Sequence, residues 1–61
     1  MTFVAGETYI SREGKEYIYI ERRQGVQIFE CAETKTRLLL NLVGRYRWDD
    51  QDHPCDIIGN K

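Results

Sequence analysis

The chain has 61 residues, and its charges nearly cancel, with nine Lys and Arg against ten Asp and Glu for a formal net charge of −1. Nucleic-acid-binding domains take most of their affinity from a basic excess, so this balance argues against a general DNA or RNA binder. It is also too mild for an acidic protein that mimics DNA over its whole surface. A chain this short forms one domain, residues 1–61, whose thin core leaves little wall for an enclosed active site. We therefore expect a protein that is not an enzyme.

No stretch of the sequence predicts export or membrane insertion. The first residues, MTFVAGETYI, lack the charged start and the long apolar run of a signal peptide. The longest apolar runs have three residues, Leu38–Leu40 among them, which is far short of a membrane span. Two cysteines without a secretion signal favour reduced thiols, so a cytoplasmic protein is expected.

Turn signals recur along the chain at glycines 6, 14, 25, 44 and 59, and the runs between them are rich in Ile, Tyr, Val, Leu and Thr. This spacing is typical of a small all-β domain. The first expected strand is Thr8–Arg12, followed by a tight turn at residues 12–15. The second, EYIYIERR at residues 16–23, alternates most clearly, with isoleucines on one face and tyrosines on the other.

The second half of the chain continues the same pattern. A turn at Gln24-Gly25 leads into a third strand over residues 26–32, in which aliphatic and aromatic side chains again take opposite faces. The run RLLLNLV, residues 37–43, is ambiguous because Leu favours helix over strand. Its shortness and the hairpin-like ETKT before it favour a strand. A fifth short strand, Asp56–Ile58, is expected to pair back towards the first.

Five short antiparallel strands predict an all-β fold, a small SH3-like barrel that is closed or nearly closed and so hides its sheet edges. The isoleucines are expected to take the inner face, and the other alternating positions to face outward. The predicted core then has ten side chains: Val4, Ile10, Ile18, Ile20, Val26, Ile28, Leu38, Leu40, Leu42 and Ile57.

This choice of faces places aromatic rings on the outside of the barrel. Tyr17, Tyr19 and Phe29 then share an outward face, to which Trp48 adds a further ring. Exposed aromatics with arginines nearby match the composition of protein-binding hot spots. Two alternatives would hide the rings: the N-terminal arm Met1–Ala5 covers this face, or a second copy of the chain covers it in a homodimer.

The closing stretch GRYRWDDQDHPCDII concentrates charged and aromatic residues, and stacked bases beside arginines are how many single-strand binders work. The alternative function, a nucleic-acid-binding barrel, would use Arg22, Arg23, Arg45, Arg47, Tyr46 and Trp48. The aspartates that follow would repel phosphate. In the other interpretation, an aromatic ring covers an open end of the barrel while the arginines pair with nearby acids.

The same stretch raises the question of a metal site. Its aspartates are the oxygen ligands that Mg²⁺ or Ca²⁺ would use: Asp49, Asp50, Asp52 and Asp56. Their spacing does not match a calcium loop, so a solvated loop is preferred. His53, Cys55 and the distant Cys31 are three soft ligands at most, whereas structural zinc takes four. We expect neither a metal nor another cofactor.

Nucleophilic catalysis would pair Cys55 with His53, two residues away, as its base. Pro54 between them is as well explained by a turn before the last strand. A Cys31–Cys55 disulfide would need an oxidising compartment. No catalytic residue is therefore expected.

Two short motifs resemble a known group of proteins. Residues 6–15, GETYISREGK, resemble the opening G-x-x-Y-x-x-R-(D/E)-G-(K/R) of many small phage and prophage proteins, and GRY with DII resembles their closing G-R-Y and D-(L/I)-(V/I). The resemblance spans residues 6–58 and implies an SH3-like β-barrel from a mobile-element accessory gene. Some small phage accessory proteins bind and block host defence machinery, such as CRISPR effector complexes. Residues 48–52 are not part of the shared pattern.

We therefore expect a non-enzymatic, phage- or prophage-derived accessory protein of the host-cell cytoplasm that binds a host protein and inhibits or adapts it. Its partner-binding surface would join the outward aromatics to the loop whose acids could mimic phosphates. The expected partner-binding residues are Tyr17, Tyr19, Phe29, Arg45, Arg47, Trp48, Asp49, Asp50 and Asp52.

Overall fold

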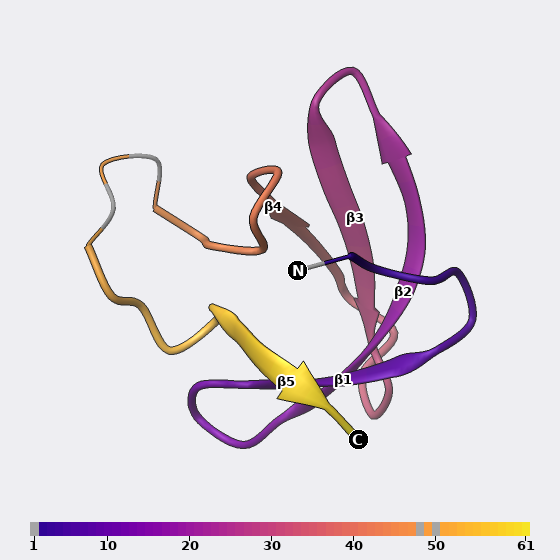
Figure 1. Cartoon of the computed structure of the whole chain (residues 1–61). Helices are drawn as coiled ribbons and strands as arrows, with labels where there is room; N and C mark the ends of the chain where they lie inside the picture. The colour runs from indigo at the N-terminus through magenta and orange to yellow at the C-terminus, as the bar shows by residue number, and fades with distance from the viewer. Residues whose placement is uncertain (1, 48, 50) are drawn as a thin grey trace.

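Five strands form close to where the sequence pattern predicts them in the computed structural model, which describes residues 2–47, 49 and 51–61 (Figure 1). The strands are β1 (Thr8–Ser11), β2 (Glu16–Arg23), β3 (Val26–Cys31), β4 (Arg37–Leu40) and β5 (Ile57–Asn60). β2 has the predicted bounds, β1 and β3 end one residue early, and β5 lies slightly later than expected. The described part of the chain contains no helix, and hence none long and apolar enough to cross a membrane. The all-β class is confirmed.

β4 is shorter than the predicted strand over residues 37–43 because Asn41 begins a turn. The Asn41 Oδ1 atom accepts hydrogen bonds from the N–H groups of Val43 and Arg45, both at 3.0 Å. Gly44 closes the turn with a φ of +82° and donates its N–H to the Asn41 carbonyl at 3.0 Å. Such a positive φ strains any residue with a Cβ atom. The segment is thus a strand followed by a turn.

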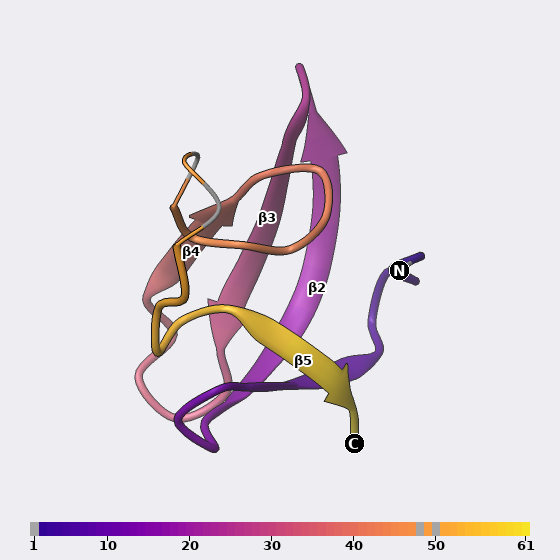
Figure 2. The ribbon, with the colours of Figure 1, turned by 60° about the vertical axis from the view of Figure 1, so that its left-hand side comes forward.

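The strands form one antiparallel sheet in the order β4-β3-β2-β1-β5. As predicted, the last strand pairs with the first, with Tyr9 opposite Asn60 and Ile10 opposite Gly59. β1 and β5 run across one end of the long β2–β3 hairpin, so the sheet curls on itself (Figure 1, Figure 2). A register shift between Tyr19 and Glu21 interrupts the ladder of β2, and such an irregularity bends a strand.

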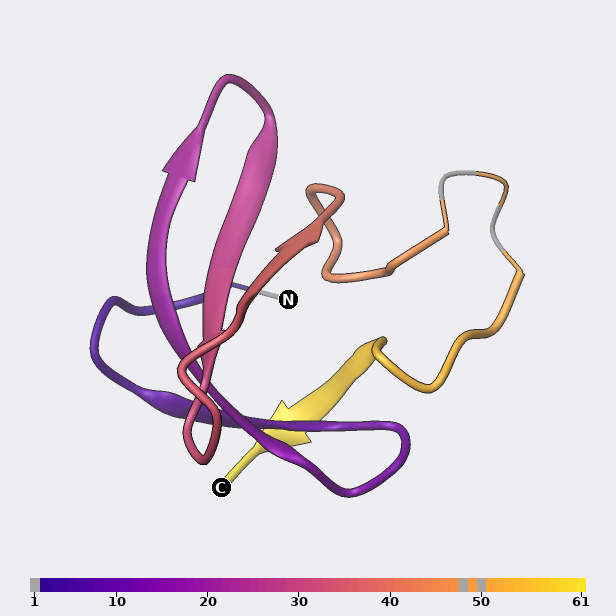
Figure 3. The same ribbon diagram turned by 180° about the vertical axis from the view of Figure 1, so that it is seen from behind.

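The sheet is not closed into a barrel. β4 and β5 are its two edges, and no strand pairing joins them within the described residues. A backbone hydrogen bond from the Ile57 N–H to the Gly44 carbonyl, 2.9 Å long, links β5 to the turn after β4. Seen from behind, the edge strand β4 lies beside β3, on the side of the segment that leads to β5 (Figure 3). The five antiparallel strands are confirmed, whereas the closed SH3-like barrel stays a prediction.

The predicted inner face of the sheet is wrong for most positions. The buried apolar side chains are Tyr9, Tyr17, Tyr19, Phe29, Cys31, Leu38, Leu40 and Ile57. Only three of the predicted core residues are among them: Leu38, Leu40 and Ile57. Five others lie half-buried on the opposite face of the sheet: Ile10, Ile18, Ile20, Val26 and Ile28. The last two, Val4 and Leu42, are 56% and 50% exposed.

The physical reason for this inversion is ring size. Alternation marks two faces of a strand, but it does not say which one is enclosed. An aromatic ring removes more apolar area from water than an aliphatic side chain does, so the rings fill the concave side. The polar tips find partners there: the Tyr19 hydroxyl donates to Gln27 Oε1 at 2.6 Å, and the Tyr9 hydroxyl accepts from the Val4 N–H at 2.8 Å.

The N-terminal arm covers the aromatic face, as one of the alternatives anticipated. Phe3 packs edge-on against Tyr9 and Phe29, with each pair of ring centroids 5.1 Å apart, and it lies 5.5 Å from the Tyr19 ring. It also touches Gly44, where an added Cβ atom would come within 2.7 Å of Phe3 Cζ. The described part of the arm, residues 2–5, therefore supplies an inward ring that the strands alone lack.

Candidate partner-binding surface

The aromatic half of the expected binding surface lies inside the protein. Tyr17 and Tyr19 are 7% exposed and Phe29 is fully buried, so the expectation that they face outward is wrong. Trp48 and Asp50 lie outside the described residues. The segment before β5, residues 45–56, is called the closing loop. Of the expected binding residues within the described part of the chain, the exposed or half-buried ones all lie in this loop: Arg45, Arg47, Asp49 and Asp52.

The closing loop is organised around the carboxylate of Asp56. This residue is 1% exposed, and its oxygens accept hydrogen bonds from the N–H groups of Tyr46 at 2.8 Å and His53 at 2.9 Å. The guanidinium of Arg12 donates to it at 3.1 Å. Burial alone would raise the pKa of Asp56, but these hydrogen bonds and the charge of Arg45 lower it. Asp56 therefore binds the loop to β1 as a buried carboxylate.

The arginines of the loop form ion pairs with its aspartates. Arg45 Nη2 lies 2.8 Å from Asp52 Oδ1, and Arg47 donates two hydrogen bonds to Asp49 at 3.0 and 2.8 Å. These hydrogen bonds from Arg47 lower the pKa of Asp49 to about 2. The pairing of the arginines with nearby acids is therefore confirmed. The other part of that alternative, an aromatic ring over an open end of the barrel, stays a prediction. Of the aspartates proposed as metal ligands or phosphate mimics, Asp49, Asp52 and Asp56 are partners of arginines, and Asp50 lies outside the described residues.

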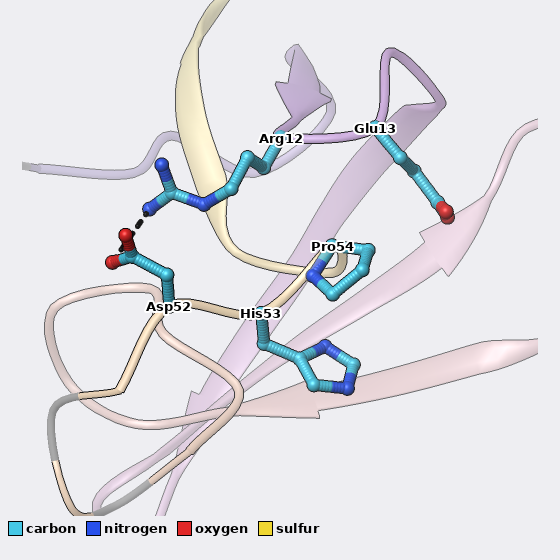
Figure 4. Close-up of a pocket in the computed structure, with 5 residues that line it drawn as sticks. All are labelled: Arg12, Glu13, Asp52, His53 and Pro54. Atoms are coloured by element: carbon cyan, nitrogen blue, oxygen red, sulfur yellow. Dashed lines mark ion pairs between the residues drawn. The ribbon is translucent and has the colours of Figure 1, made fainter.

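Arg12, which the sequence pattern did not single out, joins this network from the turn after β1. Its guanidinium lies 3.4 Å from Asp52, across a cleft of about 340 Å³ that Glu13, His53 and Pro54 also line (Figure 4). Both charges at the mouth of the cleft are thus partly neutralised by each other. We assign this cleft a structural part in holding the loop.

His53 and Cys55 are each engaged with other groups. The His53 ring stacks on Tyr46, with centroids 4.0 Å apart, and its Nδ1 atom accepts the Cys55 backbone N–H at 3.1 Å. Burial raises the pKa of the Cys55 thiol, and the nearby Tyr17 hydroxyl acts in the opposite direction. Burial likewise raises the pKa of Tyr17 to about 12, with a contribution from Cys55. The structure does not pair the imidazole with the thiol as a base with its nucleophile.

The two cysteines line one pocket of about 430 Å³, together with Tyr17, and both thiols are free. Cys31 lies at the end of β3, where hydrogen bonds from the hydroxyl and N–H of Thr34 and from the N–H of Glu33 lower its pKa. Among residues 2–47, 49 and 51–61, no three His, Cys, Asp or Glu side chains gather as metal ligands would.

The apolar side chains that stay exposed concentrate after the start of β4. Leu39, Leu42, Val43 and Tyr46 are 57%, 50%, 57% and 44% exposed. Leu39 and Tyr46 line a groove of about 500 Å³ with Arg37 and Leu38. We call the groove and the two apolar side chains of the following turn the β4 surface, formed by Arg37, Leu38, Leu39, Leu42, Val43 and Tyr46.

Sequence reasoning missed this surface although a signal for it was present. Alternation in RLLL places Leu39 on the opposite face from Leu38 and Leu40, and the pairing of β3 with β4 confirms that alternation. Leu42 was assigned to the core because the strand was expected to run through Val43. The signal that the strand ends earlier is the pair Asn41 and Gly44, a turn-forming side chain three residues before a glycine.

Comparison of the chain with protein-family models, with curated proteins and with solved structures gives no match. A function for the chain is therefore inferred from its own residues and geometry.

Proposed function

We propose that the chain is a non-enzymatic accessory protein, derived from a phage or prophage, that binds a host protein in the cytoplasm and inhibits or adapts it. A host-defence complex such as a CRISPR effector is the kind of target that the resemblance suggests. The observation that supports binding is the β4 surface, where apolar side chains remain exposed beside the buried Leu38 and Leu40.

The β4 surface has the composition of a protein contact. It combines leucines and a valine with a tyrosine and an arginine, and tyrosine and arginine are enriched at interface hot spots. Two contacts fix the position of Tyr46: its backbone N–H donates to Asp56, and its ring stacks on His53. A ring that is already ordered loses little conformational freedom on binding.

The nucleic-acid alternative has less support. Arg45 and Arg47 would have to leave their ion pairs with Asp52 and Asp49 before they could contact phosphates. Arg23 is likewise paired with Glu21 at 3.1 Å. Each of these acids would also repel an incoming phosphate.

The test compares single serine substitutions of matched exposure. The tagged protein is crosslinked in a bacterial host lysate, and any captured protein is purified and titrated with the wild type and with the variants Leu39→Ser, Val43→Ser and Ile58→Ser. Ile58 on β5 is 52% exposed and lies outside the β4 surface, so it serves as the control.

We expect Leu39→Ser and Val43→Ser to weaken the complex by at least about tenfold, the equivalent of one well-buried aliphatic contact. Ile58→Ser is expected to bind as the wild type does. Equal affinities for all three variants, or a loss confined to Ile58→Ser, would rule out the β4 surface as the contact. A captured protein whose activity is unchanged in the complex would contradict inhibition.

A further inference from the structure

The hydrogen-bonding pattern of β4 leaves one of its sides open. β3 and β4 pair antiparallel with Phe29 opposite Leu38 and Ile28 opposite Leu39, and the Cys31 N–H donates to the Thr36 carbonyl at 2.8 Å. Backbone groups in an antiparallel pair point alternately toward the partner strand and away from it. The backbone N–H and C=O groups of Leu38 and Leu40 therefore point toward β3. Those of Arg37 and Leu39 point toward the free side.

This free side is bounded at one end. Beyond Leu40, the Asn41 N–H donates to the Arg45 carbonyl at 2.9 Å, so the chain covers its own edge there. Within the described residues, no strand lies beside Arg37 and Leu39. Two residues with two backbone groups each can make four hydrogen bonds to an added strand, and an open row of this kind is a template for strand pairing.

The other edge of the sheet is covered at its start. The N–H of Ile57, at the start of β5, already donates to the Gly44 carbonyl at 2.9 Å. The turn after β4 thus lies against the beginning of β5. The two residues of β4 with outward backbone groups, Arg37 and Leu39, also line a groove.

The groove beside β4 offers space for side chains of an added strand. Its volume is about 500 Å³, and the ordered Tyr46 ring stands with Leu38 and Leu39 around it. In a β-strand, alternate side chains point to the same face. An added strand would therefore place every second side chain against these apolar groups.

The charge at this edge favours an acidic partner. The Arg37 side chain is 57% exposed, and its ion pair with Glu30 is at the limit of contact, 4.0 Å. Lys15, which lines the adjoining pocket with Arg37 and Glu33, is already paired with Glu13 at 3.5 Å. Arg37 is therefore the cation that a carboxylate on the added strand would contact. A second copy of this chain would instead bring another Arg37 to the same edge.

We propose that the partner protein inserts an extended acidic segment as an additional strand on the free edge of β4. Its backbone pairs with Arg37 and Leu39, an apolar side chain enters the groove beside Tyr46, and an Asp or Glu side chain contacts Arg37. This inference rests on the proposed function and states how the β4 surface binds its partner.

The probe is a displayed library of short random peptides, selected on the purified protein, with the enriched peptides resynthesised for titration. We expect enriched sequences to alternate apolar and polar residues and to carry Asp or Glu. Affinity is then measured for two substitutions at one position. Leu39→Ala removes the side chain only, whereas Leu39→Pro also removes the outward N–H and leaves the ladder with β3 intact.

We expect Leu39→Pro to bind at least about tenfold more weakly than Leu39→Ala, because a buried backbone hydrogen bond is lost. Arg37→Gln is expected to abolish the preference for acidic peptides. A second measurement does not depend on whether the proline variant folds: the amides of Arg37 and Leu39 should gain protection from hydrogen exchange in the peptide complex, while those of Leu38 and Leu40 stay protected throughout.

Equal binding by Leu39→Pro and Leu39→Ala, or no gain of protection at Arg37 and Leu39, would overturn strand addition. If Leu39→Ser and Val43→Ser still weaken partner binding by at least about tenfold in that case, the proposed function stands and only this mode of binding fails. Enrichment of basic or uncharged peptides would overturn the acidic assignment. Concentration-dependent dimerisation that Leu39→Pro disrupts would show a second copy as the occupant and would overturn the proposal.

Discussion

A single carboxylate fixes the course of the closing loop. Asp56 accepts hydrogen bonds from two backbone N–H groups of the loop. It accepts a third from the guanidinium of Arg12, which lies in the turn after β1. The loop has no strand of its own within its described residues, so these contacts and the arginine pairs hold it. The ordering of Tyr46, and with it one wall of the β4 groove, depends on this carboxylate.

Replacing this carboxylate should destabilise the fold. We expect Asp56→Asn to lower the free energy of unfolding by about 2 kcal/mol or more, because an amide cannot accept all the hydrogen bonds that the buried carboxylate accepts. Urea denaturation at neutral pH measures the loss. The matched control is Asp49→Asn on the exposed end of the same loop, which should leave the midpoint almost unchanged. A larger loss of stability at Asp49 than at Asp56 would contradict the role of Asp56 as the residue that holds the loop.

The difference in stability between the wild type and Asp56→Asn should depend on pH in a defined direction. Since the folded-state pKa of Asp56 is lowered, its contribution is present above the unfolded pKa of about 4 and is lost as pH falls through the folded value. The stability gap between wild type and Asp56→Asn should therefore narrow below about pH 4. A gap that stays constant in acid would show that the charge of Asp56 contributes nothing.

Tyr17 gives the opposite dependence at high pH. Burial raises its pKa to about 12 from the ordinary value of 10.0, so the folded protein keeps the phenolic proton after the unfolded chain has lost it. This contribution is present below about pH 10 and is lost between about pH 10 and 12. We expect Tyr17→Phe to flatten the fall in stability over that range. Phenolate absorbance of the folded wild type should show at least one tyrosine titrating near pH 12.

At the scale of the strands, the sequence predicts boundaries better than faces. EYIYIERR alternates so regularly that β2 has the predicted bounds, and the turn at Gln24-Gly25 forms with φ values of +51° and +80°, as a tight hairpin requires. The alternation could not show which face lies inside. That depends on Phe3, a residue outside every strand, whose ring completes the aromatic cluster.

The choice of face is tested by neighbouring substitutions on β3. Phe29 is fully buried among rings, whereas Ile28 lies half-buried on the opposite face. We expect Phe29→Leu to cost about 1–2 kcal/mol and Ile28→Val less than about 0.5 kcal/mol, because a void forms only at the buried position. Thermal or urea unfolding compares them. A greater cost at Ile28 would restore the isoleucine core.

The candidate site was less predictable than the strands. Arg45, Arg47 and the aspartates after them are close in sequence, so their mutual pairing was among the expected outcomes. Arg12 lies 44 residues before Asp56, and no local pattern connects them. The β4 surface depends on the early end of β4, which the local turn at Asn41 sets, and on the inward turn of the rings. The second of these depends on contacts between distant parts of the chain, those of Phe3 with Tyr9 and Phe29.

For the molecule as a whole, the near balance of charge is also a local balance. Arg45, Arg47 and Arg23 each face an acid of their own segment, so no broad basic surface is left by them. We expect titration with single- and double-stranded oligonucleotides at low salt to show no binding. Binding that weakens steeply as salt is raised would instead favour the nucleic-acid alternative.

The central claim is that the rings turn inward and that β4 presents an open, outward-facing edge to a partner. Amide hydrogen exchange of the free protein, resolved for each residue of β4, tests it most directly. We predict alternation, with Leu38 and Leu40 protected by their bonds to β3 and with Arg37 and Leu39 exchanging rapidly. Uniform protection of all four amides, or protection of Arg37 and Leu39 alone, would contradict the open edge.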